Sequence, residues 1–138
     1  GLVRQYYIDS KGNDITTRFN AENSFSTDYH AFIHQTPSNY NIQCLEDTTI
    51  IQLGHQDMQT CYSNYKNYER FGRLIAETIL SERQKQIESL LFENAEKRYA
   101  HFLAQNAHLF NRISVSHLST YLGIKRQSLS RIRNKMAK

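Results

Sequence analysis

The fold is decided by residues 113–138, ISVSHLSTYLGIKRQSLSRIRNKMAK, in which two short amphipathic patterns flank a glycine. Val115, Leu118 and Leu122 are spaced i, i+3 and i+7, which predicts one apolar stripe on a helix of about two turns. Gly123 can adopt the left-handed conformation that ends a helix and lets the chain turn sharply. The pattern therefore predicts a first helix that stops at a tight turn.

A second helix is predicted from about Arg126 to Met136, with Leu129, Ile132 and Met136 facing inward at i, i+3 and i+7. Ser119, four residues before the glycine, is a small side chain where two helices would cross at close range. The outer face of the second helix is polar and carries Arg126, Gln127, Ser130, Arg131 and Asn134. Together these features predict a helix-turn-helix. The alternative is an ordinary amphipathic hairpin with a solvated basic face.

The charge distribution favours the first interpretation. From residue 95 onward the chain has nine Lys and Arg residues and one acid, Glu96, so this part carries +8. The whole chain is +4, which leaves −4 for residues 1–94. Such polarity is expected when one part of a protein docks on phosphates and the other has a different task.

Length and composition indicate two small pieces within 138 residues, with a core rich in Tyr and Phe. No apolar run approaches about 18 residues and no charged-then-apolar leader opens the chain, so neither a membrane span nor a signal peptide is predicted and we expect a cytoplasmic protein. Cys44 and Cys61 have no metal or disulfide spacing, and we expect buried free thiols.

The first third of the chain has short runs of β-branched and aromatic residues. Leu2–Ile8 and Ile15–Phe19 flank a turn-rich segment at 9–14, which predicts a hairpin. Tyr40–Leu45 and Thr49–Leu53 alternate like two further strands. Short strands with frequent turns indicate an antiparallel sandwich or roll.

A helical period follows from about residue 56 to residue 92. Asp57 is a candidate N-cap for a short helix, and Asn64 for a longer one of roughly 25 residues, about 38 Å at 1.5 Å per residue. This length favours a parallel seam with a second copy in a symmetric dimer; the alternative is packing on the chain's own sheet. The predicted dimer face consists of Tyr68, Phe71, Leu74, Ile75, Thr78 and Ile79. Asn94 is then the predicted N-cap of another helix, which runs to about Gln105.

The chain resembles the Crp/Fnr family of bacterial transcription regulators, in a branch typical of Bacteroidetes, over nearly its whole length. The most specific parts are FSTDYHAFIHQTPSNYNIQCLED at 25–47, NAEKRY at 94–99 and YLGIKRQSLSRIRNKM at 121–136. The resemblance implies an α+β fold: a partial antiparallel β-roll of jelly-roll type at 1–55 that senses an effector, a short helix and a long dimerisation helix at 56–93, and a DNA-binding helix-turn-helix domain at 94–138. Some 40 to 60 residues of the roll, by its usual size, are expected to be missing before Gly1.

The resemblance also implies the partners: double-stranded DNA, a second copy of the chain and RNA polymerase, with no membrane. Members that bind cyclic nucleotides have Gly-Glu after the Phe and Arg-Ser or Arg-Ala after the Pro, whereas Phe25 is followed here by Ser26-Thr27 and Pro37 by Ser38-Asn39. Without an arginine to pair with a phosphate, binding of cyclic AMP is disfavoured and no cofactor is predicted. The cysteine cluster of the oxygen-sensing branch and the winged hairpin after the second helix are also missing.

The family's base-reading positions correspond to Arg126, Gln127, Ser130 and Arg131. An arginine paired with guanine O6 and N7 discriminates by about 1 to 3 kcal/mol. Many members have Glu where Gln127 stands, and Gln prefers the adenine edge. Phosphate contacts are expected from Ser116, His117, Lys125, Arg133 and Lys135. A dimer should bind a palindrome with half-site centres about 34 Å apart.

Three alternatives stay open. The chain could be a dimeric ligand- or metal-binding module with a basic face that reads no sequence; His30 and His34 are four residues apart, but no third ligand has a recognisable spacing, and no catalytic motif is present, so neither a metal site nor an enzyme is predicted. The basic tail of a dimeric ligand-binding module could instead contact RNA or a protein, but an RNA reader would be expected to show stacking aromatics, and the outer face of 126–134 has none. An effector pocket could be lined by His30, Phe32, His34, Tyr40 and Cys44, although we expect these residues to fill the core of the roll.

Overall fold

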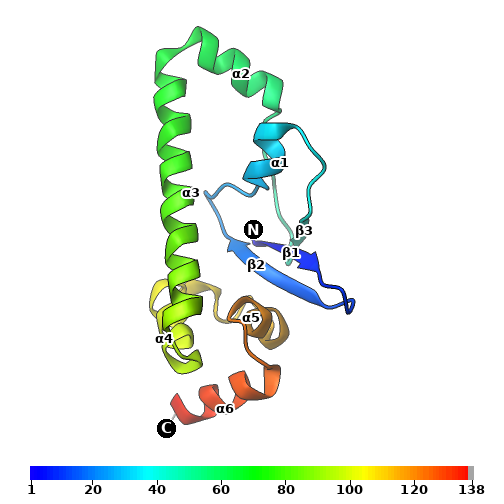
Figure 1. The fold of residues 1–138 in the computed structure, drawn as a ribbon, viewed down its shortest axis with the longest axis vertical. Coiled ribbons are helices and arrows are strands. Elements are labelled where there is room, and N and C mark those ends of the chain that lie inside the picture. Colours follow the sequence, from blue (N-terminus) through cyan, green and yellow to red (C-terminus); the bar gives the residue numbers. More distant parts are fainter. Residues whose placement is uncertain (137–138) are drawn as a thin grey trace. The chain divides into compact units, whose positions relative to one another are not determined.

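The structure is a computed structural model that describes residues 1–136. Lys138, counted above in the basic charge, therefore lies outside the described residues. The chain forms two compact units. The first unit combines Gly1–Thr49 with the segment from Glu93 onward, and the second unit is Ile50–Phe92. Figure 1 labels their helices and strands in chain order.

The sheet of the first unit has three antiparallel strands in the order β2-β1-β3. The predicted hairpin is confirmed as β1 (Val3–Ile8) and β2 (Asp14–Asn20), and β3 is Asn41–Cys44. The hairpin turn is held by Asp9, whose carboxylate accepts hydrogen bonds from the backbone amides of residues 11 and 13 at 2.8 and 2.9 Å. The small sheet and the helices confirm the predicted mixed class.

Two expectations for this region are wrong. Thr49–Leu53 does not form a strand; Ile51 is 96% exposed, and alternation alone cannot supply the neighbouring strand that a ladder needs. Cys44 is exposed rather than buried, because all four residues of the edge strand β3 are exposed.

The segment between β2 and β3 contains a short helix, α1 (Tyr29–His34). Asp28 caps it by accepting a hydrogen bond from the amide of Ala31 at 3.2 Å. The preceding loop is fixed to the sheet, since the side-chain amide of Asn20 donates to the carbonyl of Phe25 at 2.7 Å. Ala31 is the buried residue of α1.

The C-terminal helices agree closely with the prediction. They are α4 (Ala95–Gln105), the 3-10 turn η1 (Ala107–Leu109), α5 (Val115–Tyr121) and α6 (Arg126–Met136). Asn94 caps α4 by accepting from the amide of Lys97 at 3.0 Å, and Gly123 has the predicted positive φ of 65°. Leu129 is fully buried, but Met136 is 48% exposed, because the core ends one turn earlier at Ile132.

The sheet and the helix-turn-helix share one hydrophobic core. Leu2 is fully buried in the same cluster as Leu129, and Phe19 of β2 lies 5.3 Å from Tyr121 of α5, measured between ring centroids. β2 and α5 lie side by side in Figure 1. The division into 1–55, 56–93 and 94–138 stays a prediction, while the packing joins most of the first segment to the third.

The second unit consists of α2 (His55–Asn64) and α3 (Lys66–Phe92). Neither helix has a buried residue. The predicted caps are wrong: Gly54 is the N-cap of α2, with Asp57 in the first turn, and Asn64 is the last residue of α2. The carboxylate of Asp57 can still interact favourably with the amide end of the helix, which explains the acidic residue at this place. Among residues 1–136, no helix has the length and apolarity needed to cross a membrane.

Candidate nucleic-acid interface

The outer face of α6 presents the four residues predicted to read bases. Arg126, Gln127, Ser130 and Arg131 are all exposed, because Leu129 and Ile132 turn the opposite face into the core. The guanidinium of Arg131 donates a long hydrogen bond of 3.4 Å to the hydroxyl of Ser128, one turn earlier. A row of two guanidinium groups, an amide and a hydroxyl can donate to and accept from the edges of base pairs in a major groove.

The turn before α6 is braced by Arg98, whose role the sequence did not indicate. Its guanidinium donates to the carbonyl of Leu122 at 2.9 Å and to the carbonyl of Glu93 at 2.5 Å. Glu93 also pairs through its carboxylate with the Nδ1 atom of His101 at 2.9 Å. Arg98 is therefore an internal brace for the helix-turn-helix, although its charge was counted with the basic surface.

Two of the predicted phosphate contacts, Ser116 and His117, lie at the start of α5 and differ in exposure. Ser116 is exposed, whereas His117 is half-buried and its Nδ1 atom has no hydrogen-bond partner among the described residues. Burial and then the positive charge of Arg4 lower the pKa of His117, and Asp14 opposes them. The exposed hydroxyl of Ser116 can approach a phosphate here more readily than the His117 ring can.

Arg4 is itself 2% exposed and lies on the sheet face that meets α5. Its guanidinium donates to Asp14 at 2.6 Å and to Gln43 at 2.7 Å, and it lies 4.1 Å from the ring centre of Tyr6. The contact between the sheet and α5 therefore has a polar, charged part around Arg4 and an aromatic part around Phe19. The charges are compensated inside the contact, as a buried guanidinium requires.

The remaining predicted phosphate contacts differ in availability. Lys125 is exposed at the start of α6. Arg133 is half-buried, with its guanidinium carbon 4.7 Å from the ring centre of Phe110, a cation–π geometry. Lys135 donates to both carboxylate oxygens of Glu96, at 2.9 and 3.0 Å.

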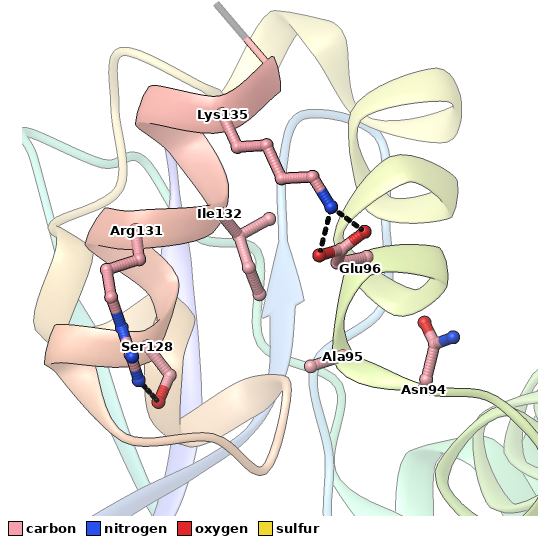
Figure 2. Close-up of a pocket in the computed structure, with 7 residues that line it drawn as sticks. All are labelled: Asn94, Ala95, Glu96, Ser128, Arg131, Ile132 and Lys135. Atoms are coloured by element: carbon pink, nitrogen blue, oxygen red, sulfur yellow. Dashed lines mark hydrogen bonds and ion pairs between the residues drawn. The ribbon is translucent and has the colours of Figure 1, made fainter.

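A groove of about 540 Å³ separates the start of α4 from α6 (Figure 2). Figure 2 shows Lys135 and Glu96 reaching toward each other across it, while Arg131 points toward Ser128. Its walls are formed by Asn94, Ala95, Glu96, Ser128, Arg131, Ile132 and Lys135. One feature of the sequence pointed to this site: Glu96 is the single acid among the residues from 95 onward.

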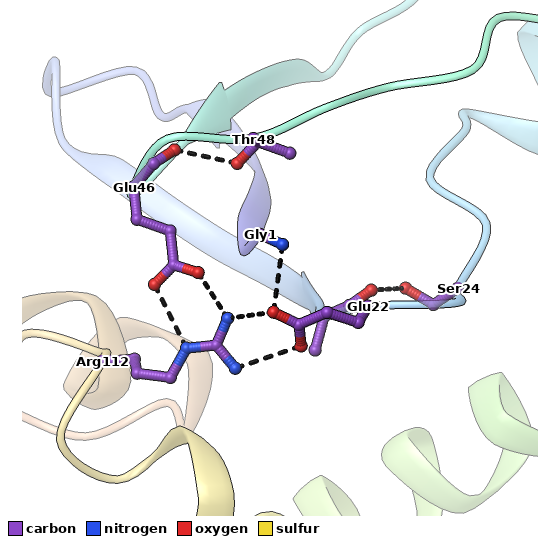
Figure 3. A network of polar contacts seen from close by, with 7 residues as sticks. Gly1, Glu22, Ser24, Glu46, Thr48 and Arg112 are labelled. Carbon is purple, nitrogen blue, oxygen red and sulfur yellow. Dashed lines mark hydrogen bonds and ion pairs between the residues drawn. The ribbon is translucent and has the colours of Figure 1, made fainter.

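Arg112 is also paired with carboxylates of the same chain rather than left free on the basic surface. Figure 3 shows its guanidinium between the carboxylates of Glu22 and Glu46, and the distance from its Nη2 atom to Glu22 is 2.6 Å. The amino group of Gly1 lies 3.0 Å from Glu22 as well. The guanidinium lowers the pKa of both carboxyl groups. Through Arg112, the network ties the segment before α5 to the loops that follow β2 and β3, which contain Glu22 and Glu46.

The proposed effector residues do not fill a core. His30, His34, Tyr40 and Cys44 are exposed and Phe32 is half-buried, so the expectation of core filling is wrong. The rings of His30 and His34 lie 4.5 Å apart on α1, one turn from each other. Within residues 1–136, no group of three or more His, Cys, Asp and Glu side chains is arranged to hold a metal ion.

The predicted dimer face follows α3 as one apolar stripe. Tyr68, Phe71 and Leu74 are 48%, 49% and 46% exposed. Ile75 and Ile79 are half-buried, and the hydroxyl of Thr78 donates back to the carbonyl of Leu74 at 2.9 Å. These residues are placed at helical spacing on a helix that has no buried residue.

A small antiparallel sheet, a long helix and a C-terminal helix-turn-helix define the fold seen in Crp/Fnr-type regulators. Over 99% of its length, the chain has the fold of a solved protein from Eubacterium rectale described as a transcriptional regulator of the Crp/Fnr family, with a TM-score of 0.75 and 16% sequence identity. The chain spans 66% of the length of that protein. The sequence matches no protein-family model and no curated protein. The predicted resemblance is thus confirmed at the level of the fold.

Proposed function

We propose that this chain is a sequence-specific DNA-binding transcription regulator that uses α6 as its recognition helix. The observation that carries the proposal is the exposed row Arg126, Gln127, Ser130 and Arg131, which is held outward by the buried Leu129. The row stands on a helix fixed by a capped α5, a glycine turn and the Arg98 brace. A rigid helix with convergent polar groups is what direct readout in the major groove requires.

The proposed division of labour separates base contacts from phosphate contacts. Arg126 and Arg131 pair with guanines, and Gln127 favours an adenine edge. Lys125 and Ser116, exposed near the starts of α6 and α5, contact phosphates and set affinity without reading sequence. The base-specific part of the free energy therefore resides in few side chains.

The proposed active species is a homodimer joined along α3. This helix has 27 residues and a length of about 40 Å, and its apolar stripe has no buried member. A second copy packed in parallel would cover the stripe and place two recognition helices on a palindrome with half-site centres about 34 Å apart. The fold resemblance adds RNA polymerase as a further proposed partner.

The proposed regulator does not respond to cyclic AMP. Where a nucleotide-binding relative would have arginine after the proline, Ser38 uses its hydroxyl within the protein. It donates to Asp28 at 2.9 Å and accepts from the amide of Tyr40 at 3.0 Å. With no guanidinium at this place, a cyclic phosphate would lose its bidentate partner. Unchanged DNA affinity on addition of cyclic AMP is the expected result.

The test is selection of bound duplexes from a random DNA pool, followed by titration of the selected sequence at several salt concentrations. Wild type is compared with Arg131→Ala, and Arg73→Ala on α3 is the control for loss of one exposed arginine. A palindrome should emerge, and Arg131→Ala should lower discrimination against its mutated half-sites by about 1 to 3 kcal/mol while salt-dependent binding persists. Arg73→Ala should retain the preference.

The proposal is overturned if wild type enriches no sequence and its affinity only follows the salt concentration. In that case the basic face is a solvated surface, and the chain is better described as a module with another ligand. Equal loss of preference in Arg131→Ala and Arg73→Ala would also contradict the role of α6, because only net charge would then matter.

A further inference from the structure

The groove between α4 and α6 contains an ion pair at the edge of the proposed DNA surface. Lys135 of α6 donates to both carboxylate oxygens of Glu96 in the first turn of α4. Glu96 is the only acidic residue between positions 94 and 138. Arg131 and Ser128 also line this groove, where the guanidinium of Arg131 points toward the hydroxyl of Ser128 (Figure 2). The ammonium of Lys135 therefore already holds an anion through two oxygens.

The ion pair contributes little to folding. The side chains of Lys135 and Glu96 are 69% and 52% exposed. Exposed pairs of this kind contribute little or nothing measurable to stability, because water and salt screen them. An incoming anion can therefore displace Glu96 from Lys135 with little loss of folding stability.

We propose that Glu96 occupies the place of a DNA backbone phosphate in this groove and holds Lys135 until DNA displaces it. This inference rests on the proposed function, since it assigns one phosphate contact of that same surface. The carboxylate offers the ammonium two oxygens, as the two non-bridging oxygens of a phosphodiester do. A neighbouring phosphate meets the negative charge of Glu96, so Glu96 weakens binding to every sequence equally and leaves base discrimination unchanged.

A structural role of Glu96 has a different signature. An acid in the first turn of a helix stabilises it through the helix dipole, so the loss of Glu96 would lower the melting temperature. It would not change how DNA affinity depends on salt. The slope of the logarithm of affinity against the logarithm of salt concentration therefore separates the two roles.

The experiment measures that slope for wild type, E96Q, K135A and the double variant, on the selected palindrome and on a scrambled duplex. Glu96→Ser, with a residue favoured at helix starts, is a second variant in case E96Q folds poorly. Asp47→Asn is the matched control, since it removes one exposed carboxylate from the same unit. E96Q should bind both duplexes roughly threefold to tenfold more tightly, the scale of one surface charge interaction.

The slope should steepen by about 0.9 in E96Q, because the release of the phosphate's counterion on contact with Lys135 is then no longer offset by a cation that the freed Glu96 carboxylate takes up in wild type. In the K135A background the same substitution should leave the slope unchanged, and Asp47→Asn should behave like wild type. Wild-type affinity and slope in both Glu96 variants would overturn the inference while the regulator function stands. An equal gain in Asp47→Asn would overturn it too. Failure of wild type itself to select a sequence would instead refute the proposed function.

Discussion

The two units of this chain are stabilised in different ways. In the first unit, Leu2 and Leu129 are fully buried in a core to which both the sheet and the helices contribute. In the second unit, α2 and α3 have no buried residue, and Leu80 and Phe92 are 70% and 80% exposed. The first unit therefore has a closed core of its own, whereas the apolar stripe along α3 has no buried residue within the second unit, which is the observation behind the proposed dimer.

Truncation of one leucine in each unit should change the free energy of unfolding by very different amounts. Leu129→Ala should lower the free energy of unfolding by about 2 to 5 kcal/mol, because it leaves a cavity in a closed core. Leu80→Ala on α3 should change it by less than about 0.5 kcal/mol, since that side chain loses little burial. Urea unfolding followed by circular dichroism measures both. Similar losses for the two variants would show that α3 is covered at Leu80 as fully as the core is at Leu129.

The second effect concerns association. Leu74→Glu places a charge in the middle of the apolar stripe of α3 and should weaken the proposed dimer by at least about 2 kcal/mol, roughly thirtyfold in Kd. Leu80→Glu, outside the predicted dimer face, is the matched control. Sedimentation equilibrium over a range of concentrations gives the dissociation constants. A wild-type chain that stays monomeric at all concentrations would contradict the seam, and so would equal weakening by both variants.

Replacing a glycine by alanine should destabilise the two units to different, smaller extents. Gly123 has φ 65° in the turn before α6, and Ala is strained there by about 1 to 2 kcal/mol. Gly54, the N-cap of α2, has an ordinary φ of −74°, so Gly54→Ala should cost less. Thermal unfolding of the two variants tests the order. A harmless Gly123→Ala would show that the turn can reach a right-handed conformation without loss.

The prediction from sequence succeeded where the signals are local. The bounds of α4 and α6 agree with expectation because Asn94 caps one helix and Gly123 separates the other from α5 within a few residues. It failed where the outcome depends on distant partners. Thr49–Leu53 alternates like a strand, but no strand pairs with it.

The candidate site shows the same limit. The row on α6 was predictable, since the period of the apolar residues fixes which side chains face outward. The hydrogen-bond partners of Arg98, Arg112 and Lys135 were not predictable, because each pairs with a carbonyl or carboxylate that is distant in the sequence. Arg112, for example, pairs with Glu22, which is 90 positions away. A count of basic residues therefore overestimates the positive charge that is left unpaired on the surface.

The smallest effect is a pH dependence confined to the first unit. Burial against the sheet and the charge of Arg4 lower the pKa of His117, so the folded state favours the neutral ring. Above the ordinary histidine pKa of about 6.5, the His117 ring is neutral in both the folded and the unfolded chain, and it does not reduce the free energy of unfolding. As the pH falls through that value, the unfolded chain takes up the proton first, and stability declines until the folded pKa is passed.

Wild type should therefore lose more stability between pH 7.5 and about 5.5 than His117→Gln does, as measured by urea unfolding at each pH. The exposed His108, changed to Gln, is the control and should keep the wild-type decline. The carboxyl groups of Glu22 and Glu46 do not interfere, because Arg112 lowers their pKa values and moves their titration further below this window. Parallel profiles for wild type and His117→Gln would mean that the ring takes up a proton in place. The polar part of the contact between sheet and α5 would then tolerate a second positive charge beside Arg4.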